Sequence, residues 1–265
     1  MAGARYQRLI RDLRTMEGAA VAFSGGVDST LLLHAGQQAL GNHVVALTAS
    51  TPYMAGPEIQ QARELAARFG VRHVVLELPF PEALRTNPAD HCYPCKKYLF
   101  TRLWQATREL GLGHLLDGTN LDDLDDYRPG LRALAELGVS SPLRQAGLTK
   151  EDIRALSHRE GLPTWNKPPM ACLLSRMPAN HYVNDADLRR VEAAETFLME
   201  QGFPWVRVRV HDDAARIEIP RDRLSDMLQG SLPHRVDTRL RTLGFRHVSL
   251  DLAGYRTGSL NSTKK

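Results

Sequence analysis

The stretch Ala19-Ala-Val-Ala-Phe-Ser-Gly-Gly-Val-Asp-Ser-Thr30 decides the fold. Its apolar first half is typical of a buried strand, and Leu31-Leu32-Leu33 directly behind it opens a helix. A glycine turn between a strand and a helix N-terminus presents free backbone N–H groups and the positive end of the helix dipole. The stretch therefore predicts a site for a phosphate chain.

The polar residues of this stretch suit such a ligand. The candidate binding residues are Ser24, Gly25, Gly26, Asp28, Ser29 and Thr30. The glycines let the backbone approach a ligand, and the hydroxyls add hydrogen-bond donors. Asp28 could cap helix N–H groups or help to hold a Mg²⁺ ion that shares the phosphates. The Walker A pattern is absent, so the phosphates would be cradled without any lysine.

The segment Ser24-Gly-Gly-Val-Asp-Ser29 resembles the PP-loop of the ATP pyrophosphatases. Members of this superfamily adenylate a substrate and release pyrophosphate, so the resemblance implies that ATP binds here. The alternative is a serine and glycine turn that only caps a helix. The position between an apolar strand and a helix favours the nucleotide site.

Composition places the chain among ordinary globular proteins. It has 265 residues, 43% hydrophobic and 24% charged, enough for one large or two modest domains. The net charge of +4 and the pI near 9.1 fall short of a nucleic-acid footprint, so no nucleic-acid partner is expected. No apolar run is long enough to cross a bilayer, and the N-terminal residues are too charged for a signal peptide. We expect a cytoplasmic protein with no membrane partner.

Strand and helix patterns alternate over the first part of the chain. The predicted strands are 19–23, 44–48 and 71–78, and the run 114–120 predicts a fourth strand that ends in a glycine and hydroxyl turn. With helices between them, they predict an α/β fold with a doubly wound parallel sheet (PP-loop/HUP-like), which binds ligand at the carboxyl ends of its strands. Thr48 ends the second strand and would lie beside the adenine, while Gly118 and Thr119 follow the fourth strand.

A long irregular stretch with three prolines, 163–177, interrupts the alternation and is of a length that is usually functional. We therefore divide the chain into a PP-loop ATP pyrophosphatase domain, 1–177, and a smaller C-terminal α+β domain, 178–265, for substrate binding or oligomerisation. The elements expected in the second domain are a helix capped by Asn184 that ends near 201, strands at 205–210 and 214–219, two short helices, and a last strand at 246–252.

Polar residues before this stretch predict local caps. Thr149-x-x-Asp152 is a capping-box variant that would start a helix running to Glu160. An acidic patch is either a solvated loop or a group that lies near magnesium or caps the next helix. It consists of Asp122, Asp123, Asp125 and Asp126.

The three cysteines lie in segments that are difficult to explain as core. Cys92 and Cys95 have C-x-x-C spacing, which suits two ligands of one metal centre or a redox pair, and Cys172 lies in the proline-rich stretch. An iron–sulfur cluster held by three cysteines leaves one iron open to another ligand. The alternatives are a zinc clip, with His91 or His181 as a fourth ligand, and a buried apolar thiol at Cys172.

Together these segments resemble the LarE family of ATP-dependent sulfur-insertion enzymes over nearly the whole chain. The motifs that carry the resemblance are the PP-loop, Cys92-Tyr-Pro-Cys95-Lys-Lys, Asp117-Gly-Thr-Asn120, Asp126-Tyr-Arg-Pro-Gly130, Ala171-Cys172-Leu-Leu-Ser-Arg176, Val206-Arg-Val-Arg209 and Ala215-Arg-Ile-Glu218. The PP-loop alone indicates only a superfamily. The Ala-Cys-x-x-Ser-Arg loop and the Arg-x-Arg strand are far more specific.

The resemblance implies a reaction in nickel-pincer nucleotide biosynthesis. ATP would adenylate a carboxylate of pyridinium-3,5-biscarboxylic acid mononucleotide, and sulfur would replace AMP to give a thiocarboxylate. In some members the residue matching Cys172 gives up its own sulfur, and members with the C-x-x-C pair are thought to hold a [4Fe-4S] cluster. Because all three cysteines are present, we expect Cys92, Cys95 and Cys172 to hold the cluster, with Cys172 as the catalytic residue and an external sulfide or sulfur donor as a partner.

The resemblance also implies a set of substrate contacts. The residues in matching positions are Ser175, Arg176, Glu195, Arg207, Arg209 and Glu218. Arg207 and Arg209 are two apart on a predicted strand, so they point to the same face and could grip the substrate phosphate or its second carboxylate. The alternative is an exposed basic strand face. Family members often form symmetric oligomers, which leaves a homo-oligomer open.

Three rival functions follow from the same residues. A PP-loop tRNA thiolase would use a similar cluster but needs a broad basic surface, which the modest net charge argues against. An ATP-dependent amide synthase would leave the cysteines without a role. A nucleotide-binding regulatory module would need them only as a zinc clip.

Overall fold

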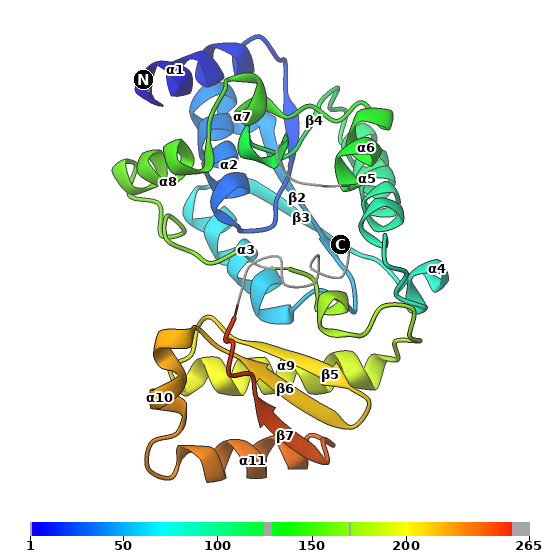
Figure 1. Cartoon of the computed structure of the whole chain (residues 1–265). Coiled ribbons are helices and arrows are strands. Elements are labelled where there is room, and N and C mark those ends of the chain that lie inside the picture. The colour runs from blue at the N-terminus through cyan, green and yellow to red at the C-terminus, as the bar shows by residue number, and fades with distance from the viewer. Residues whose placement is uncertain (1, 125–128, 170, 256–265) are drawn as a thin grey trace. The chain divides into compact units, whose positions relative to one another are not determined.

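The computed structural model describes residues 2–124, 129–169 and 171–255, and the chain packs into two compact units (Figure 1). The first unit comprises Met1–Pro79 and Asp90–Met170, and the second Phe80–Ala89 and Ala171–Lys265. The sequence placed the division at 177, whereas 171–177 and the short segment 80–89 pack with the second unit. Division into functional domains at 177 stays a prediction.

The first unit contains a four-stranded sheet in the order β3-β2-β1-β4 with every pairing parallel, which confirms the predicted α/β class. Its strands are β1 Ala19–Ala22, β2 Val44–Ser50, β3 Arg72–Glu77 and β4 Leu115–Leu116. Its helices are α1 Ala2–Leu13, α2 Val27–Leu40, α3 Gly56–Arg68, α5 Cys92–Glu109, α6 Pro129–Glu136, α7 Pro142–Gln145 and α8 Lys150–Arg159, with 3-10 turns η1 Gly41–His43 and η2 Asp122–Leu124. In Figure 1, α1, α2 and α8 lie on one side of the strands and α5 and α6 on the other.

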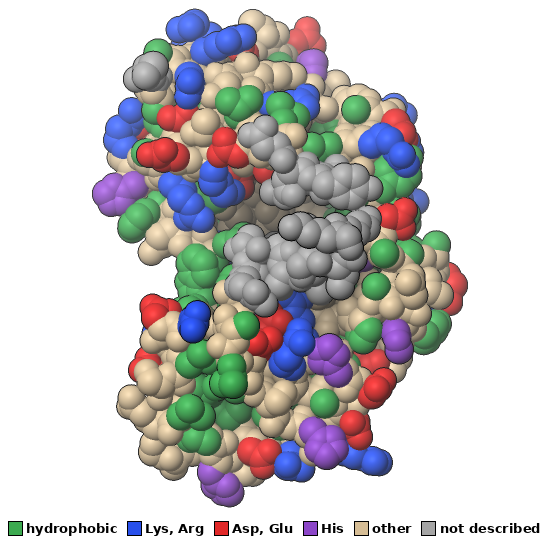
Figure 2. Space-filling model, viewed as in Figure 1, with side chains coloured by type: hydrophobic (Ala, Val, Ile, Leu, Met, Phe, Trp, Pro, Cys, Tyr) green, Lys and Arg blue, Asp and Glu red, His purple; other side chains and the backbone are tan. Residues whose placement is uncertain are grey.

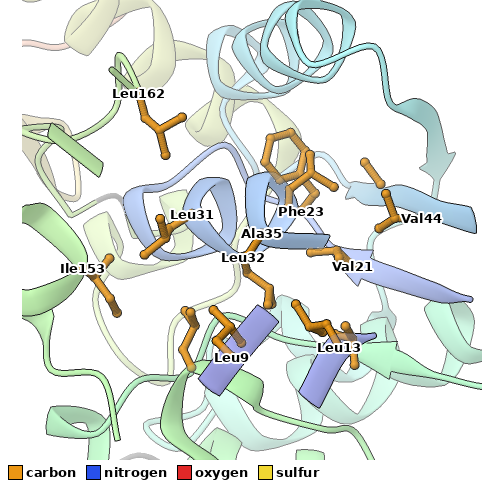
Figure 3. Packing of buried hydrophobic residues seen from close by; sticks show 14 of the residues in the cluster. Leu9, Leu13, Val21, Phe23, Leu31, Leu32, Ala35, Val44, Ile153 and Leu162 are labelled. Carbon is orange, nitrogen blue, oxygen red and sulfur yellow. The ribbon is translucent and has the colours of Figure 1, made fainter. Parts of the chain in front are cut away.

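Helix α2 is deeply packed in this unit. Leu31, Leu32 and Leu33 are all fully buried, because the helix lies between the sheet and the apolar faces of α1 and α8 (Figure 3). Leu9 and Leu13 of α1 pack in the same core cluster. This packing fixes the axis of α2, and with it the position of its N-terminus, which begins at Val27 within the 24–30 loop.

Strand β4 is shorter than the sequence predicted. Only Leu115 and Leu116 pair with β1, because the residues that follow are taken up by side-chain hydrogen bonds. The hydroxyls of Thr119 and Ser141 both donate to the carboxylate of Asp117, which folds the chain into a turn immediately after the strand.

The second unit is the expected small α+β structure. Its sheet has the order β5-β6-β7, with an antiparallel β5/β6 hairpin and a parallel β6/β7 pair. Asp212 turns the hairpin with φ of +54°. The strands are β5 Arg207–His211, β6 Ala214–Glu218 and β7 His247–Leu250. The helices are α4 Glu82–Arg85, α9 Asp185–Glu200, α10 Leu224–Met227 and α11 Leu232–Thr242, with 3-10 turns η3 Leu173–Arg176 and η4 Arg221–Arg223.

The side chains of Arg85 and Asn87 tie the segment 80–89 into the second unit. The Asn87 amide donates to the carbonyl oxygens of Leu174, Met177 and Pro178, and Arg85 donates to Asp185 at the start of α9. Asn184 caps α9 by accepting a hydrogen bond from the backbone of Asp187, as predicted.

The predicted capping box at Thr149 is present and carries a further charge interaction. Thr149 Oγ1 accepts from the Asp152 backbone, the Asp152 carboxylate accepts from the Thr149 backbone, and Arg5 of α1 donates to the same carboxylate at 2.6 Å. Burial opposes ionisation of Asp152, but these hydrogen bonds outweigh it and hold its pKa below the ordinary value.

We predict that Asp152→Asn lowers the free energy of unfolding by about 1 kcal/mol at neutral pH, the usual value of a helix cap. Because a depressed pKa stabilises the fold above the unfolded-state pKa and is lost as pH falls through the folded-state value, the difference should shrink in acid. Urea unfolding at neutral pH and near pH 3, which is below the unfolded-state carboxyl pKa of about 3.9, measures this. Glu151→Gln, an exposed neighbour, is the control. An equal difference at both pH values contradicts the prediction.

Candidate functional site

The sheet order places two loops at one point. The chain moves outward from β1 through β2 to β3 and then returns to β4 on the other side of β1, so the direction of winding reverses between β1 and β4. In open α/β sheets, ligands bind outside the carboxyl ends of the strands at such a switch point. The 24–30 loop follows β1 and the turn 117–120 follows β4, so both lie where a ligand is expected.

The 24–30 loop is built to accept an anion. Gly25 has φ of +66°, and a Cβ there would lie 3.4 Å from the backbone of Ala62. Gly26 is the N-cap residue of α2, and no side chain of the described residues caps this helix end. The N–H groups of its first turn therefore remain available, with the positive end of the helix dipole behind them. Ser24 and Ser29 place their hydroxyl oxygens 3.1 Å apart at the same point.

The turn after β4 packs directly against this helix end. A Cβ on Gly118 would lie 3.1 Å from the backbone nitrogen of Ser29 and 3.2 Å from Cβ of Asp28, so only glycine fits without displacement. The hydroxyl of Thr119 is engaged by Asp117, and Thr30 is fully buried. The structure thus brings Gly118 to the 24–30 loop. The Thr119 hydroxyl hydrogen-bonds to Asp117, and the Thr30 hydroxyl is buried without a hydrogen-bond partner among the described residues.

Two lysines from distant segments reach the loop, which the loop sequence alone gave no means to foresee. Lys150 Nζ lies 2.5 Å from Oδ2 of Asp28, and the Asn120 amide donates to the other carboxylate oxygen at 3.2 Å. Lys167 Nζ donates to the Gly25 carbonyl oxygen at 2.9 Å. The loop has no lysine of its own, but two lysines from other segments lie beside it. The expectation that phosphates are bound without any lysine stays a prediction.

The acidic patch is partly accounted for. Asp122 accepts a hydrogen bond from the backbone of Lys150 and Asp123 from the backbone of Asn120, so these two carboxylates act as caps and turn contacts. Asp125 and Asp126 lie outside the described residues, as does part of the motif Asp126-Tyr-Arg-Pro-Gly130.

Thr48 is at the end of β2, beside the loop, but its hydroxyl is already used. It donates to the Phe23 carbonyl at 2.6 Å and lies 2.7 Å from Nε2 of His73. Because the single hydroxyl proton goes to the carbonyl, Nε2 of His73 must carry the proton of the second bond. Burial, and then Arg63, lower the pKa of His73, which keeps its ring neutral. The predicted adenine contact of Thr48 stays a prediction.

The C-x-x-C pair opens helix α5 in the first unit. Cys92 is exposed and Cys95 buried, and the three-residue spacing places both on one helix face. The Tyr53 hydroxyl lies 3.4 Å from Cys95 Sγ. Burial raises the pKa of the Cys95 thiol, and the Tyr53 hydroxyl partly offsets this. The pair can supply two thiolates to one metal centre. Within the described residues, no three His, Cys, Asp or Glu side chains gather to hold a metal ion, so the zinc clip and the three-cysteine cluster both stay predictions.

Cys172 belongs to the second unit, where a buried charged cluster holds its segment. The Arg176 guanidinium makes two hydrogen bonds to the Glu195 carboxylate, at 2.9 and 3.0 Å, and also donates to the carbonyl oxygens of Ala171 and Cys172. The Ser175 hydroxyl donates to the Cys172 carbonyl at 2.8 Å. The segment that carries the thiol is therefore fixed through its backbone.

The predicted substrate residues of the hairpin meet at the same place. Arg209 pairs with Glu218 at 3.0 Å and donates to the carbonyl oxygen of Ser175, while Arg207 donates to the Val206 carbonyl. Both arginines are buried, so the alternative of an exposed basic strand face is wrong. Burial, with Arg176 close by, lowers the pKa of Arg207. Hydrogen bonds link five of the six predicted substrate residues in the second unit, Ser175, Arg176, Glu195, Arg209 and Glu218. Arg207 lies close enough for the charges of Arg176 and Glu195 to act on it. The role of all six toward substrate stays a prediction.

Comparison with known proteins identifies the family. Residues 9–92 match the family model described as asparagine synthase. The pyridinium-3,5-bisthiocarboxylic acid mononucleotide synthase of Lactiplantibacillus plantarum is 39% identical over 96% of this chain and 93% of its own length. The chain belongs to the LarE family. An uncharacterised protein of Synechocystis sp. is 37% identical over 98% of both chains. A tRNA-specific 2-thiouridylase of Rickettsia felis is 29% identical over only 56% of this LarE-family chain.

Membership of the LarE family confirms the class of enzyme that the motifs predicted, a sulfurtransferase of the PP-loop ATP pyrophosphatase superfamily. Its 24–30 loop is the PP-loop of that superfamily. None of the helices within the described part of this LarE-family chain is long and apolar enough to span a membrane.

We predict that Gly118→Ala destabilises this LarE-family chain by roughly 1–3 kcal/mol, as overpacking does, and weakens ATP binding because the N-terminus of α2 must shift. Gly113→Ala is the matched control, since nothing lies within 4 Å of its added Cβ. Urea unfolding and nucleotide titration measure the two effects. If both variants behave alike, the close approach of Gly118 to α2 has no energetic role.

Glu195→Ala should lower the free energy of unfolding by roughly 3–5 kcal/mol, because it leaves the buried Arg176 guanidinium without its carboxylate. Asp213→Ala breaks only the exposed pair with Arg246, at 3.7 Å, and should cost less than about 1 kcal/mol. Urea denaturation monitored by circular dichroism compares the two. A small loss for Glu195→Ala would show that the cluster does not hold the second unit.

Proposed function

We propose that this chain converts pyridinium-3,5-biscarboxylic acid mononucleotide into its thiocarboxylate in nickel-pincer nucleotide biosynthesis. The observation that carries this proposal is the 39% identity, over nearly the full length of both chains, to a synthase named for the bisthiocarboxylated product. The PP-loop at the switch point and a fixed cysteine segment in the second unit provide the two functions that such a reaction needs.

The first step is activation of a carboxylate, which is by itself a poor electrophile. The N–H groups at the start of α2 would bind the phosphates of ATP, and Asp28 would share a Mg²⁺ ion with them. A carboxylate oxygen of the substrate attacks the α-phosphorus, the bond to the β-phosphate oxygen breaks, and pyrophosphate leaves with the electron pair. The product is an acyl adenylate, in which AMP is a good leaving group.

In the second step, sulfur attacks the acyl carbon and AMP departs with the former carboxylate oxygen. We assign Cys172 as the catalytic residue of this step, because Arg176 and Ser175 hold its backbone in one position. When bound by Cys92, Cys95 and Cys172, a [4Fe-4S] cluster would offer an open iron at which an external sulfide can be carried. The C-x-x-C pair on one face of α5 fits two of its three ligands.

The decisive experiment is anaerobic purification with iron and sulfide quantified, then incubation with ATP, the biscarboxylated nucleotide and sulfide. The expected result is a product heavier by the exchange of oxygen for sulfur, with more than one turnover per chain, and loss of this product in Cys172→Ala. Cys92→Ala and Cys95→Ala should each abolish repeated turnover. A single turnover, after which Cys172 has lost the mass of H₂S, would replace the cluster route by the sacrificial route.

A tRNA thiolase is the second candidate, because the Rickettsia felis 2-thiouridylase shares part of its sequence with this chain. The match covers 51% of that protein, which leaves much of its length without a counterpart. On the face shown in Figure 2, basic and acidic side chains are interspersed among the coloured residues of each unit. Tight, salt-sensitive tRNA binding would favour this candidate.

A further inference from the structure

Lys167 is a cation at the PP-loop whose ammonium group hydrogen-bonds to neutral oxygens within the described residues. Its Nζ donates to the Gly25 carbonyl oxygen at 2.9 Å and to the amide oxygen of Gln61 on α3, both neutral groups. The field of Glu58 favours its charge, but burial is the larger effect and lowers the pKa of Lys167. The half-buried ammonium group is therefore hydrogen-bonded but could still bind an anionic ligand.

The backbone of Lys167 is held firmly by helix α8. Arg154 donates to the Trp165 carbonyl at 2.7 Å and to the Lys167 carbonyl at 3.0 Å, and the Lys167 N–H donates to Thr164. The Trp165 ring also meets the ring of His158 edge to face, with centroids 4.7 Å apart. The ammonium is therefore presented from a rigid support, which removes much of the entropy cost of binding a ligand.

Lys150 reaches the same loop, but its charge has a different partner from that of Lys167. Its ammonium is compensated by the Asp28 carboxylate at 2.5 Å, whereas Lys167 meets only neutral oxygens. Asp28 compensates Lys150, while Lys167, which feels the field of Glu58 but hydrogen-bonds to neutral oxygens, adds positive charge beside the positive end of the α2 dipole. Such a site is complementary to a ligand with several negative charges, which a pyrophosphate or triphosphate carries and a monophosphate largely lacks.

We propose that Lys167 is the phosphate-binding cation of this PP-loop and that it binds the phosphates that leave as pyrophosphate. This inference rests on the adenylation step proposed above. When the bond between the α-phosphorus and the bridging oxygen breaks, the electron pair goes to the pyrophosphate, and the ammonium stabilises that growing charge without giving up a proton. The proline-rich segment thus supplies from a distance the lysine that the loop sequence lacks.

The test compares variants of the full chain by calorimetric titration with Mg²⁺-pyrophosphate, Mg²⁺-ATP and AMP. Lys167→Gln keeps a hydrogen-bond donor for Gly25 and Gln61 but removes the charge. It should weaken the binding of pyrophosphate and ATP about 10- to 100-fold, which is the range of one charge-assisted hydrogen bond. It should weaken the binding of AMP less than about 3-fold. Lys167→Arg, which keeps the charge, should retain more pyrophosphate affinity than Lys167→Gln. Arg68→Gln removes an exposed charge from the same unit and should change nothing.

Two results would overturn the inference. One is wild-type pyrophosphate affinity in Lys167→Gln. The other is an equal loss of affinity for pyrophosphate and AMP, which would show that Lys167 has only a structural role. Thermal unfolding of each variant confirms that it is folded. The outcomes for function are separate. If pyrophosphate binding depends on Lys167 but no thiocarboxylate forms, the proposed function fails and this inference stands. If thiocarboxylate forms while Lys167→Gln binds pyrophosphate normally, only this inference fails.

Discussion

The fixed, uncapped N-terminus of α2 is the feature on which the first unit depends. The helix is buried along three consecutive leucines, which hold it in place. Among the residues that the structure describes, no side chain accepts a hydrogen bond from the N–H groups of Val27, Asp28 or Ser29. Backbone N–H groups without partners are costly unless water or a ligand satisfies them. The surrounding contacts, with Gly118 packed on Ser29 and Lys150 paired with Asp28, preserve this opening and surround it with charge.

In the second unit, buried ion pairs hold the backbone around Cys172. Buried ion pairs such as Arg176–Glu195 and Arg209–Glu218 contribute little net stability, because desolvation offsets most of the Coulomb attraction. Their geometric effect is larger. The remaining guanidinium donors reach the carbonyl oxygens of the 171–176 segment, so one network fixes the backbone on both sides of Cys172. Placement of a reactive sulfur gains more from such rigidity than from stability.

Local features of both units could be predicted from the sequence, and features made by packing could not. The 24–30 loop, the capping box at Thr149 and the Asn184 cap each depend on residues within a few positions, so their patterns were sufficient. Lys167 reaches a loop 142 residues away, and the Asn87 contacts with the 174–178 carbonyls depend on tertiary packing. The sequence likewise indicated that Arg207 and Arg209 share a strand face, but not that this face is buried.

The central claim is that the PP-loop serves adenylation of a carboxylate, and the fate of the carboxylate oxygen tests it directly. The substrate is labelled with heavy oxygen in its carboxylates, and the nucleotide products are analysed by mass spectrometry. Attack at the α-phosphorus followed by sulfur transfer predicts one heavy oxygen in AMP and none in pyrophosphate. Heavy oxygen in inorganic phosphate, with ADP as the other product, would show attack at the γ-phosphorus and contradict the account.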